Sequence, residues 1–240
     1  VLKGEVELPH TKRKVTTWAM FTNNEADLWL KSIEYLNDAT YYYSLWNGDY
    51  PYNHVTAVDG ALSAGAGMEY PNITVIGESG NDFSLEQVIM HEVGHNWFYG
   101  ILGTNERQHP WMDEGINSFN ELRYVKTKYP DRKLVGEINE KNEKALKWFD
   151  LHHHDYQHQY ELMYLFNAKR NKDQPIELHA AEYTPFNYGG IVYSKTAVVF
   201  NYLFDYLGEE KFDKCMQRYY REWQFKHPQP NDLRKIFEEE

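Results

Sequence analysis

Residues 91–95 read HEVGH, and the apolar residues around this motif recur at helical spacing. The apolar stripe has four members: Met90, Val93, Trp97 and Ile101. Their separations of three and four positions predict an amphipathic helix that begins near Asp82. His91 and His95 lie one turn apart on such a helix, so both imidazoles project to the same side and can bind one metal ion. The segment therefore predicts a helix that buries one face and presents two histidines on another.

A third candidate ligand follows the histidine pair. A catalytic zinc ion has three protein ligands and one open position, so two histidines leave it one ligand short. Glu114 follows His95 after eighteen intervening residues. The motif H-E-x-x-H arises by chance about 0.05 times in such a chain, and requiring Glu114 as well lowers this to about 0.005. Surface histidines on an ordinary helix are the alternative for the motif alone, whereas the three residues together predict one zinc ion per chain.

Two further glutamates lie on the predicted helices. Glu92 is rotated by about 100° from His91, so it can reach a metal-bound water without being a ligand. Zinc lowers the pKa of its water to about 7, and a carboxylate in this position is a candidate general base for hydrolysis. Glu121 lies on the same helix face as Glu114, seven residues further along. It is either a hydrogen-bond acceptor for a ligand histidine or a solvated carboxylate.

The local sequence patterns separate strands from helices along the chain. Strands are expected at three β-prone runs: 15–21, 54–58 and 72–76. Helices are expected at five segments: 25–45, 82–101, 111–129, 191–207 and 232–240. Asn24 is expected to cap the first helix, and Gly208 is expected to end the helix at 191–207. Residues 134–178 are expected to form only helical fragments. Strands that come first and helices that follow are typical of an α+β fold.

Composition limits the partners of the chain. The net charge of −11 repels phosphate backbones, so nucleic acid is not expected as a partner. The longest apolar runs are shorter than about eighteen residues, so a membrane span is not expected either. Cys215 is the single cysteine and is expected to be a small core residue, which leaves the compartment open. The chain begins without Met or a targeting segment and stops inside a predicted helix, so we expect flanking domains. The localisation is left open, and export is one of the possibilities.

Four segments resemble the aminopeptidase N family of gluzincins, whose catalytic domain is thermolysin-like. In chain order they are GAGMEYP (65–71), HEVGHNWFYG (91–100), WMDEGINSF (111–119) and IVYSKTA (191–197). The resemblance implies a monomeric catalytic domain that acts on peptides. It also implies a β-rich lobe at about 1–80, a mainly helical lobe at about 81–240 and an active site between them.

The resemblance also implies roles for individual residues outside the metal motif. Glu69 would bind the free α-amino group of the substrate, which restricts cleavage to the N-terminal residue. Gly67 and Met68 would lie on an edge strand that pairs with the substrate backbone, and Gly65 and Gly67 lack side chains that would block its approach. Tyr193 would donate a hydrogen bond to the developing oxyanion.

Three positions depart from the family pattern, and other readings stay open. Tyr70 stands where the family has Asn, Asp113 precedes Glu114 where Asn is usual, and Thr196 stands where Gly is frequent. One alternative is an endopeptidase of the same class in which Glu69 does not select free amines. Another is an inactive relative that serves as a binding module. Several histidines are expected in loops without a metal: His109, His152, His153, His154 and His158.

Overall fold

The computed structural model describes residues 1–60, 62, 66–136 and 141–240. It divides into two compact units. Unit 1 comprises Val1–Asn105 and Phe204–Glu240, and unit 2 comprises Glu106–Leu203. The strands of the described chain lie in unit 1, followed along the sequence by helices, so the predicted α+β class is confirmed. The β-rich lobe at about 1–80 and the helical lobe at about 81–240 were defined by their expected secondary structure, and their bounds differ from those of the two units. The division into these lobes stays a prediction.

A mixed five-stranded sheet forms the centre of unit 1, with the order β1-β2-β3-β5-β4. Its strands are β1 (Leu2–Glu7), β2 (Lys14–Met20), β3 (His54–Asp59), β4 (Gly67–Met68) and β5 (Ile73–Ile76). The central pairs β2–β3 and β3–β5 are parallel, whereas β1 and β4 run antiparallel to their neighbours. The three predicted strands are confirmed as β2, β3 and β5, with boundaries that differ by at most one residue. The short strand β4 forms one edge of this sheet.

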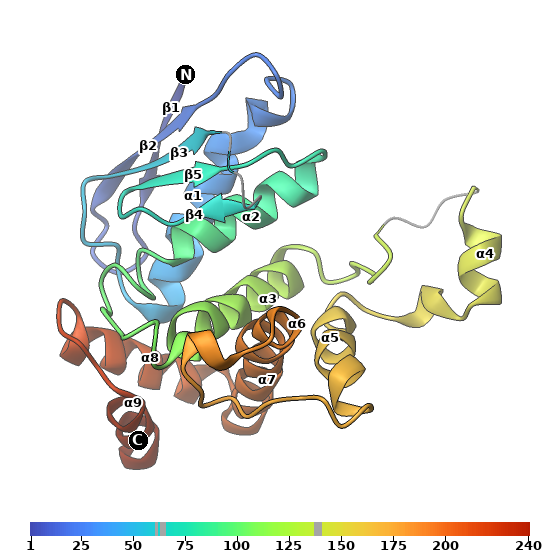
Figure 1. Cartoon of the computed structure of the whole chain (residues 1–240). Coiled ribbons are helices and arrows are strands. Elements are labelled where there is room, and N and C mark those ends of the chain that lie inside the picture. Colours follow the sequence, from blue (N-terminus) through green and yellow to red (C-terminus); the bar gives the residue numbers. More distant parts are fainter. Residues whose placement is uncertain (61, 63–65, 137–140) are drawn as a thin grey trace. The chain divides into compact units, whose positions relative to one another are not determined.

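Helices α1 (Ser32–Asn47) and α2 (Asp82–Gly94) pack against the sheet in unit 1 (Figure 1). The sheet contributes alternate residues of β2 to the core, since Val15, Thr17 and Ala19 are fully buried. Helix α1 contributes buried positions at helical spacing, among them Leu36 and Tyr43.

The first predicted helix starts later than expected, and the predicted cap is wrong. A short 3-10 turn, η1 (Leu28–Lys31), precedes α1, and Asn24 lies outside both. Other contacts hold the preceding residues. The Thr22 hydroxyl donates to Asp59 at the end of β3, and the Glu25 carboxylate accepts from the backbone N–H groups of Ser79 and Gly80. These tertiary bonds hold residues 23–27 in bends and a turn at the position where local propensity would start a helix.

Helix α2 begins where its sequence predicts but ends before Ile101. Asn81 caps it, because the side-chain oxygen accepts from the Ser84 N–H at 3.0 Å. After Gly94 the backbone bonds first have a spacing of three or four residues, and from Gly100, whose N–H bonds to the carbonyl of His95, they have a spacing of five. Tyr99 then has a φ of 126°, which a helix does not allow. The apolar stripe is nevertheless buried along its whole length, including Trp97 and Ile101.

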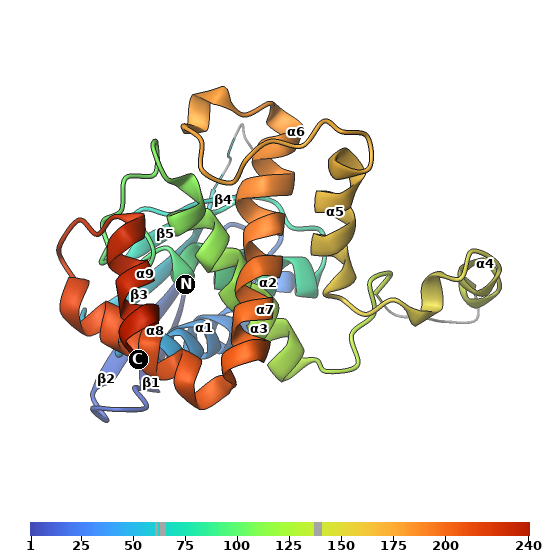
Figure 2. The same cartoon turned by 90° about the horizontal axis from the view of Figure 1, so that it is seen from below.

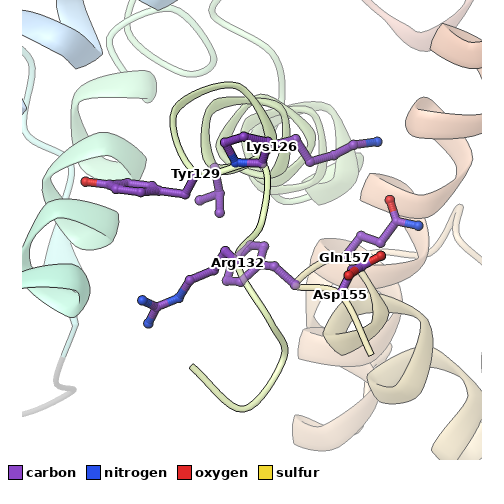
Figure 3. Close-up of a pocket in the computed structure, with 8 residues that line it drawn as sticks. Lys126, Tyr129, Arg132, Asp155 and Gln157 are labelled. Carbon is purple, nitrogen blue, oxygen red and sulfur yellow. The ribbon is translucent and has the colours of Figure 1, made fainter. Parts of the chain in front are cut away.

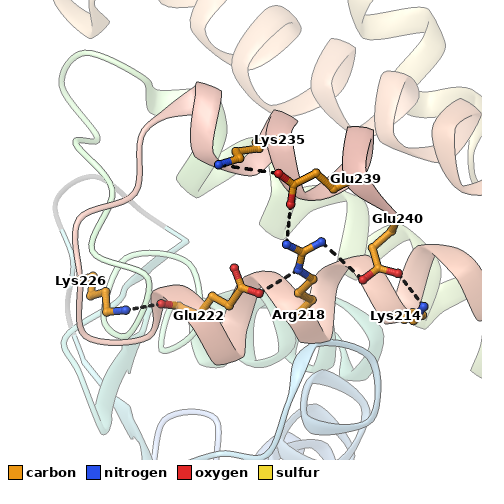
Figure 4. A network of polar contacts seen from close by, with 7 residues as sticks. All are labelled: Lys214, Arg218, Glu222, Lys226, Lys235, Glu239 and Glu240. Carbon is orange, nitrogen blue, oxygen red and sulfur yellow. Dashed lines mark hydrogen bonds and ion pairs between the residues drawn. The ribbon is translucent and has the colours of Figure 1, made fainter.

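The C-terminal helices α8 (Glu209–Trp223) and α9 (Pro230–Glu239) complete unit 1. Arg218 of α8 binds Glu222 at 2.8 Å, Glu239 at 2.6 Å and Glu240 at 3.4 Å (Figure 4). Hydrogen bonding to Arg218 lowers the pKa of Glu239, and hydrogen bonding to Lys214 lowers the pKa of Glu240. Cys215 is buried, as predicted for a core residue. Arg218 thereby joins the end of α9 to α8.

Unit 2 consists of helices in its described residues. They are η2 (Trp111–Gly115), α3 (Ile116–Lys128), α4 (Glu143–Trp148), η3 (Leu151–His153), α5 (His158–Ala168), η4 (Ala180–Glu182), α6 (Pro185–Asn187), η5 (Tyr188–Lys195) and α7 (Thr196–Leu207), which continues past Leu203. The predicted helices at 111–129 and 191–207 are confirmed, but η2 and η5 are π-helical. Gly208 ends α7 with a φ of 79°, as predicted. Helix α4 has six residues, none of them buried, and lies apart from α5 and α7 in Figures 1 and 2.

The fragments predicted between residues 134 and 178 are α4, η3 and α5. Among the residues that the structure describes, no helix combines the length and the apolar character that a membrane span requires.

Candidate metal centre

The two histidines of HEVGH lie at the C-terminal end of α2. His91 is in the last turn and His95 is the C-cap residue. Their Nε2 atoms are 3.1 Å apart. Two imidazole nitrogens bound to one tetrahedral zinc ion at about 2.0–2.1 Å lie roughly 3.4 Å from each other. The pair therefore has the spacing and the donor chemistry of two ligands of a single ion.

A backbone contact fixes the tautomer of His95. Its Nδ1 atom lies 3.1 Å from the carbonyl oxygen of Phe98. A carbonyl only accepts hydrogen bonds, so Nδ1 carries the proton and Nε2 of the neutral ring keeps its lone pair for a metal. The carbonyl comes from the turn in which Tyr99 has its unusual φ, and the His95 side chain is 1% exposed. The way in which α2 ends therefore orients a candidate ligand.

Glu92 lies in unit 1 with the histidines and is 5% exposed. Its carboxylate lies against the edge strand, since a Cβ atom placed on Gly67 would be 2.3 Å from Oε1 of Glu92. The absence of a side chain at Gly67 thus makes room for the candidate general base. Gly67 and Met68 form the predicted edge strand, and Glu69 follows it directly. Gly65, also named from the sequence, lies outside the described residues.

Asn96 is a buried residue near this site that sequence reasoning missed. Its Oδ1 accepts from the backbone N–H of Asn72 at 2.9 Å and from the Tyr50 hydroxyl at 3.4 Å. Its Nδ2 donates to the carbonyl of Val93 at 2.9 Å. Asn96 follows a candidate ligand, and Asn72 follows Glu69 by three residues, so the amide joins the end of α2 to the segment after the edge strand. The sequence offered only a weak signal, a polar residue between the stripe residues Val93 and Trp97.

Glu114 and Tyr193 lie together in unit 2, on the π-helical segments η2 and η5. A side-chain hydrogen bond connects them. Burial first, and then the neighbouring Glu114 carboxylate, raise the pKa of the Tyr193 hydroxyl well above its ordinary value. The hydroxyl therefore keeps its proton at neutral pH and can act as a donor. The predicted third ligand and the predicted oxyanion donor are thus adjacent.

Glu121 is buried in unit 2, so it is not a solvated carboxylate. Its Oε1 accepts from the Tyr160 hydroxyl at 2.6 Å and from the Tyr156 hydroxyl at 3.3 Å. Burial and these bonds keep both phenols protonated, because they raise the pKa of each. The predicted bond from Glu121 to a ligand histidine stays a prediction.

Two further polar features of unit 2 were compared with the predicted site. His109 is in a loop, as predicted, and both His109 and Trp111 contact the Glu177 carboxylate. A hollow of about 220 Å³ is lined by Lys126, Tyr129, Arg132, Asp155 and Gln157, among others. In Figure 3 Lys126 extends on the side of Asp155 and Gln157, whereas Tyr129 and Arg132 point to the other side. Neither Glu114 nor Tyr193 lines this hollow, so it is not the predicted site.

Asp150, His152 and His153 also place potential ligand atoms near one another. The side chains of Asp150 and His153 are 79% and 70% exposed. Their exposure agrees with the solvated segment expected from the sequence, but the predicted loop is wrong for three histidines. His152 and His153 lie in η3, and His158 is the first residue of α5. Separate observations support each half of the predicted zinc site: unit 1 holds His91 and His95, and unit 2 holds Glu114 with its tyrosine.

Known proteins share both the sequence and the fold of this chain. Human endoplasmic reticulum aminopeptidase 2 is 26% identical over 151 residues, which are 62% of this chain and 14% of that protein. Aminopeptidase M1-C of Oryza sativa subsp. japonica is 23% identical over 188 residues, 74% of this chain and 20% of that protein. The chain thus spans a fifth or less of the length of these curated relatives.

Two solved structures have a similar fold. The M1 zinc metallopeptidase from Deinococcus radiodurans has a TM-score of 0.64 at 14% identity, covering 98% of this chain and 47% of that one. Aminopeptidase A of Legionella pneumophila, in complex with aspartic acid, has a TM-score of 0.69 at 12% identity, covering 99% of this chain and 26% of that one. The family description "Peptidase family M1 domain" matches residues 32–240. With this match over most of its length, the chain belongs to peptidase family M1.

Proposed function

We propose that this chain is the catalytic domain of a zinc-dependent aminopeptidase, in which His91, His95 and Glu114 bind one zinc ion. The observation that carries the proposal is the 3.1 Å separation of the two histidine Nε2 atoms, together with the bond that leaves the His95 lone pair at Nε2. Glu114 supplies a carboxylate oxygen, which completes a two-histidine, one-glutamate set of the kind that catalytic zinc sites use.

The reaction is hydrolysis of a peptide bond. When bound, zinc supplies an activated water with a pKa of about 7 and polarises the scissile carbonyl. Glu92 accepts the proton of the nucleophile and transfers it to the leaving amine. Burial of Glu92 against Gly67 restricts the positions that its carboxylate can adopt. Tyr193 remains protonated and donates a hydrogen bond to the oxygen that becomes negative in the transition state.

The edge strand supplies substrate binding in this proposal. β4 pairs with β5 along one of its sides, so its other side offers backbone groups for an extended peptide. Glu69 follows β4 and binds the α-ammonium group of the substrate by a charge-assisted pair. A peptide held in this way presents the bond after its first residue for cleavage. The names of the curated relatives, which are aminopeptidases, support this specificity.

Zinc analysis and kinetics of the full-length protein test the proposal. One zinc ion per chain is expected, and a chelator should abolish turnover of a free aminoacyl fluorogenic substrate. Substitution of His95 by Ala should remove both the zinc and the activity. Turnover that survives the chelator would contradict the metal mechanism, whereas a zinc-loaded protein without turnover would favour a binding module.

A comparison of two substrates tests the exopeptidase claim separately. The same peptide is offered with a free and with an N-acetylated terminus. We expect cleavage of the free form and a large rise of its KM in a Glu69→Gln variant. Preference for the acetylated peptide would show an endopeptidase and would leave the zinc site intact.

A further inference from the structure

Gly115 permits a very close approach between η2 and η5 in unit 2. A Cβ atom on Gly115 would lie 2.4 Å from Cγ2 and 2.5 Å from Cβ of Thr196, and 2.5 Å from the carbonyl oxygen of Val192. Thr196 is fully buried, and its hydroxyl lies 3.3 Å from the carbonyl oxygen of Ile191. The two segments therefore meet with no space for one additional methyl group.

This contact lies between the residues that carry the chemistry of unit 2. Glu114 directly precedes Gly115, and Tyr193 lies between Val192 and Thr196 in the sequence. Both segments are π-helical. This conformation is rare in proteins as a whole, but where it occurs it is frequently part of a functional site. Since the side chains of Glu114 and Tyr193 share a hydrogen bond, the separation of the two backbones at Gly115 sets how far apart these groups are.

We propose that Gly115 and Thr196 are positioning residues that set the distance between the Glu114 carboxylate and the Tyr193 hydroxyl. The proposal rests on the proposed function, in which Glu114 binds zinc and Tyr193 donates to the oxyanion. A threonine at position 196, where the family often has glycine, fills the space beside Gly115 with its methyl group. Thr196 thus acts as a fixed spacer between the two segments.

Addition of one methyl group at Gly115 tests the spacer. An ordinary contact of Cβ with carbon or oxygen begins near 3.4 Å, so Gly115→Ala requires the two segments to separate by about 1 Å. A displacement of that size at a reacting group lowers the rate by about a hundredfold. We therefore expect kcat, measured at saturating zinc, to fall by about 10- to 100-fold, with KM close to that of the unchanged protein.

Gly189→Ala is the matched control. Gly189 lies in the same segment as Tyr193, and among the described residues no heavy atom lies within 4 Å of its built Cβ once the immediate neighbours are left out. The control should keep kcat within about twofold of the starting value, as is usual for substitutions without strain or lost contacts. A fall in kcat equal to that of Gly115→Ala would assign the effect to helix propensity and would overturn the proposal.

A double-mutant cycle with Tyr193→Phe separates positioning from general damage. If Gly115 acts through the tyrosine hydroxyl, Gly115→Ala should lower kcat by less than about threefold in the Tyr193→Phe background. An equal loss in both backgrounds would overturn the inference and leave the proposed function standing. Full activity of Tyr193→Phe alone would instead contradict the proposed role of Tyr193, and the inference would fail with it.

A crystal structure of the metal-free Gly115→Ala protein gives a readout that does not depend on activity. The separation of the Glu114 and Tyr193 side chains should increase by about 1 Å relative to the Gly189→Ala control, and an unchanged separation would overturn the proposal. If Gly115→Ala does not fold, Thr196→Ser serves in its place. This variant keeps the hydroxyl and removes the methyl group nearest Gly115, so kcat should fall by about threefold when Tyr193 is present and remain unchanged in the Tyr193→Phe background.

Discussion

Asn96→Ala tests whether a buried amide joins the end of α2 to the segment after the edge strand. The substitution removes three contacts, to Asn72, Tyr50 and Val93. Two of the partners keep other bonds. The Tyr50 hydroxyl still has Asn72 Oδ1 at 2.8 Å and the His54 carbonyl at 3.1 Å, and the Val93 carbonyl still accepts from the backbone N–H of residue 96.

The cost of Asn96→Ala therefore comes mainly from one group, the backbone N–H of Asn72. A donor that loses its partner costs about 1–3 kcal/mol of the free energy of unfolding. Asn72 is half-buried, so water can reach its N–H more easily than that of a fully buried residue. We expect a loss of about 1–2 kcal/mol for the metal-free protein, and a rise in KM because Glu69 lies three residues before Asn72.

Urea unfolding and amide hydrogen exchange measure this effect at two levels. The midpoint in urea should fall, and the N–H of Asn72 should exchange about 5- to 30-fold faster, since about 1.4 kcal/mol is a factor of ten. Asn24→Ala is the control, because Asn24 is exposed and outside the neighbouring helices. An ordinary surface substitution changes the free energy of unfolding by up to about 0.5 kcal/mol. The reasoning is refuted if Asn96→Ala changes it by no more than this and the N–H of Asn72 keeps its protection from exchange.

Three further substitutions have expected outcomes. Glu92→Gln should retain zinc and lower kcat by about 10²- to 10⁴-fold, measured by metal analysis and steady-state kinetics. Asn81→Ala should reduce the free energy of unfolding by about 1 kcal/mol and Asn81→Ser by a few tenths, measured by urea unfolding, because serine also caps a helix. Arg218→Met should lower the melting temperature at pH 7. The pKa values of Glu239 and Glu240 are depressed in the folded protein. The stabilisation that their ion pairs with Arg218 provide is therefore complete above the ordinary pKa of 4.5 and is lost as the pH falls through the depressed values. Arg218→Met and the unchanged protein should melt at the same temperature at about pH 2 or in about 1 M salt. A difference in melting temperature that persists there would contradict the ion-pair explanation.

The sequence alone predicted those helices and strands in which the spacing of apolar side chains shows which face is buried. The apolar stripe around HEVGH predicted the helix that became α2, and β-branched runs predicted β2, β3 and β5. The close approach of His91 and His95 followed from helical geometry alone. These features depend on local periodicity, which a single sequence displays.

Features that depend on distant contacts were not accessible in this way. The wrong cap at Asn24 reflects bonds from Thr22 to Asp59 and from residues 79–80 to Glu25, which join segments far apart in the sequence. The π-helical form of η2 and η5 adds one residue to a turn, but the two segments have only five and eight residues, which is too short for periodicity to distinguish them from an α-helix. Asn96 was missed for a related reason, because its partner Asn72 is identified only once the fold is known.

Each unit orients its own candidate ligands by a bond that does not involve the metal. In unit 1 the Phe98 carbonyl holds the His95 ring in the tautomer that zinc requires, and in unit 2 the Tyr193 hydroxyl holds the Glu114 carboxylate. Ligands that are already oriented lose less conformational freedom when an ion binds, which strengthens binding without an additional contact. Because Tyr193 is at once the partner of a ligand and the proposed oxyanion donor, its removal should affect both zinc affinity and kcat. Loss of the bond to Phe98 should weaken zinc binding with a smaller effect on kcat once the site is saturated.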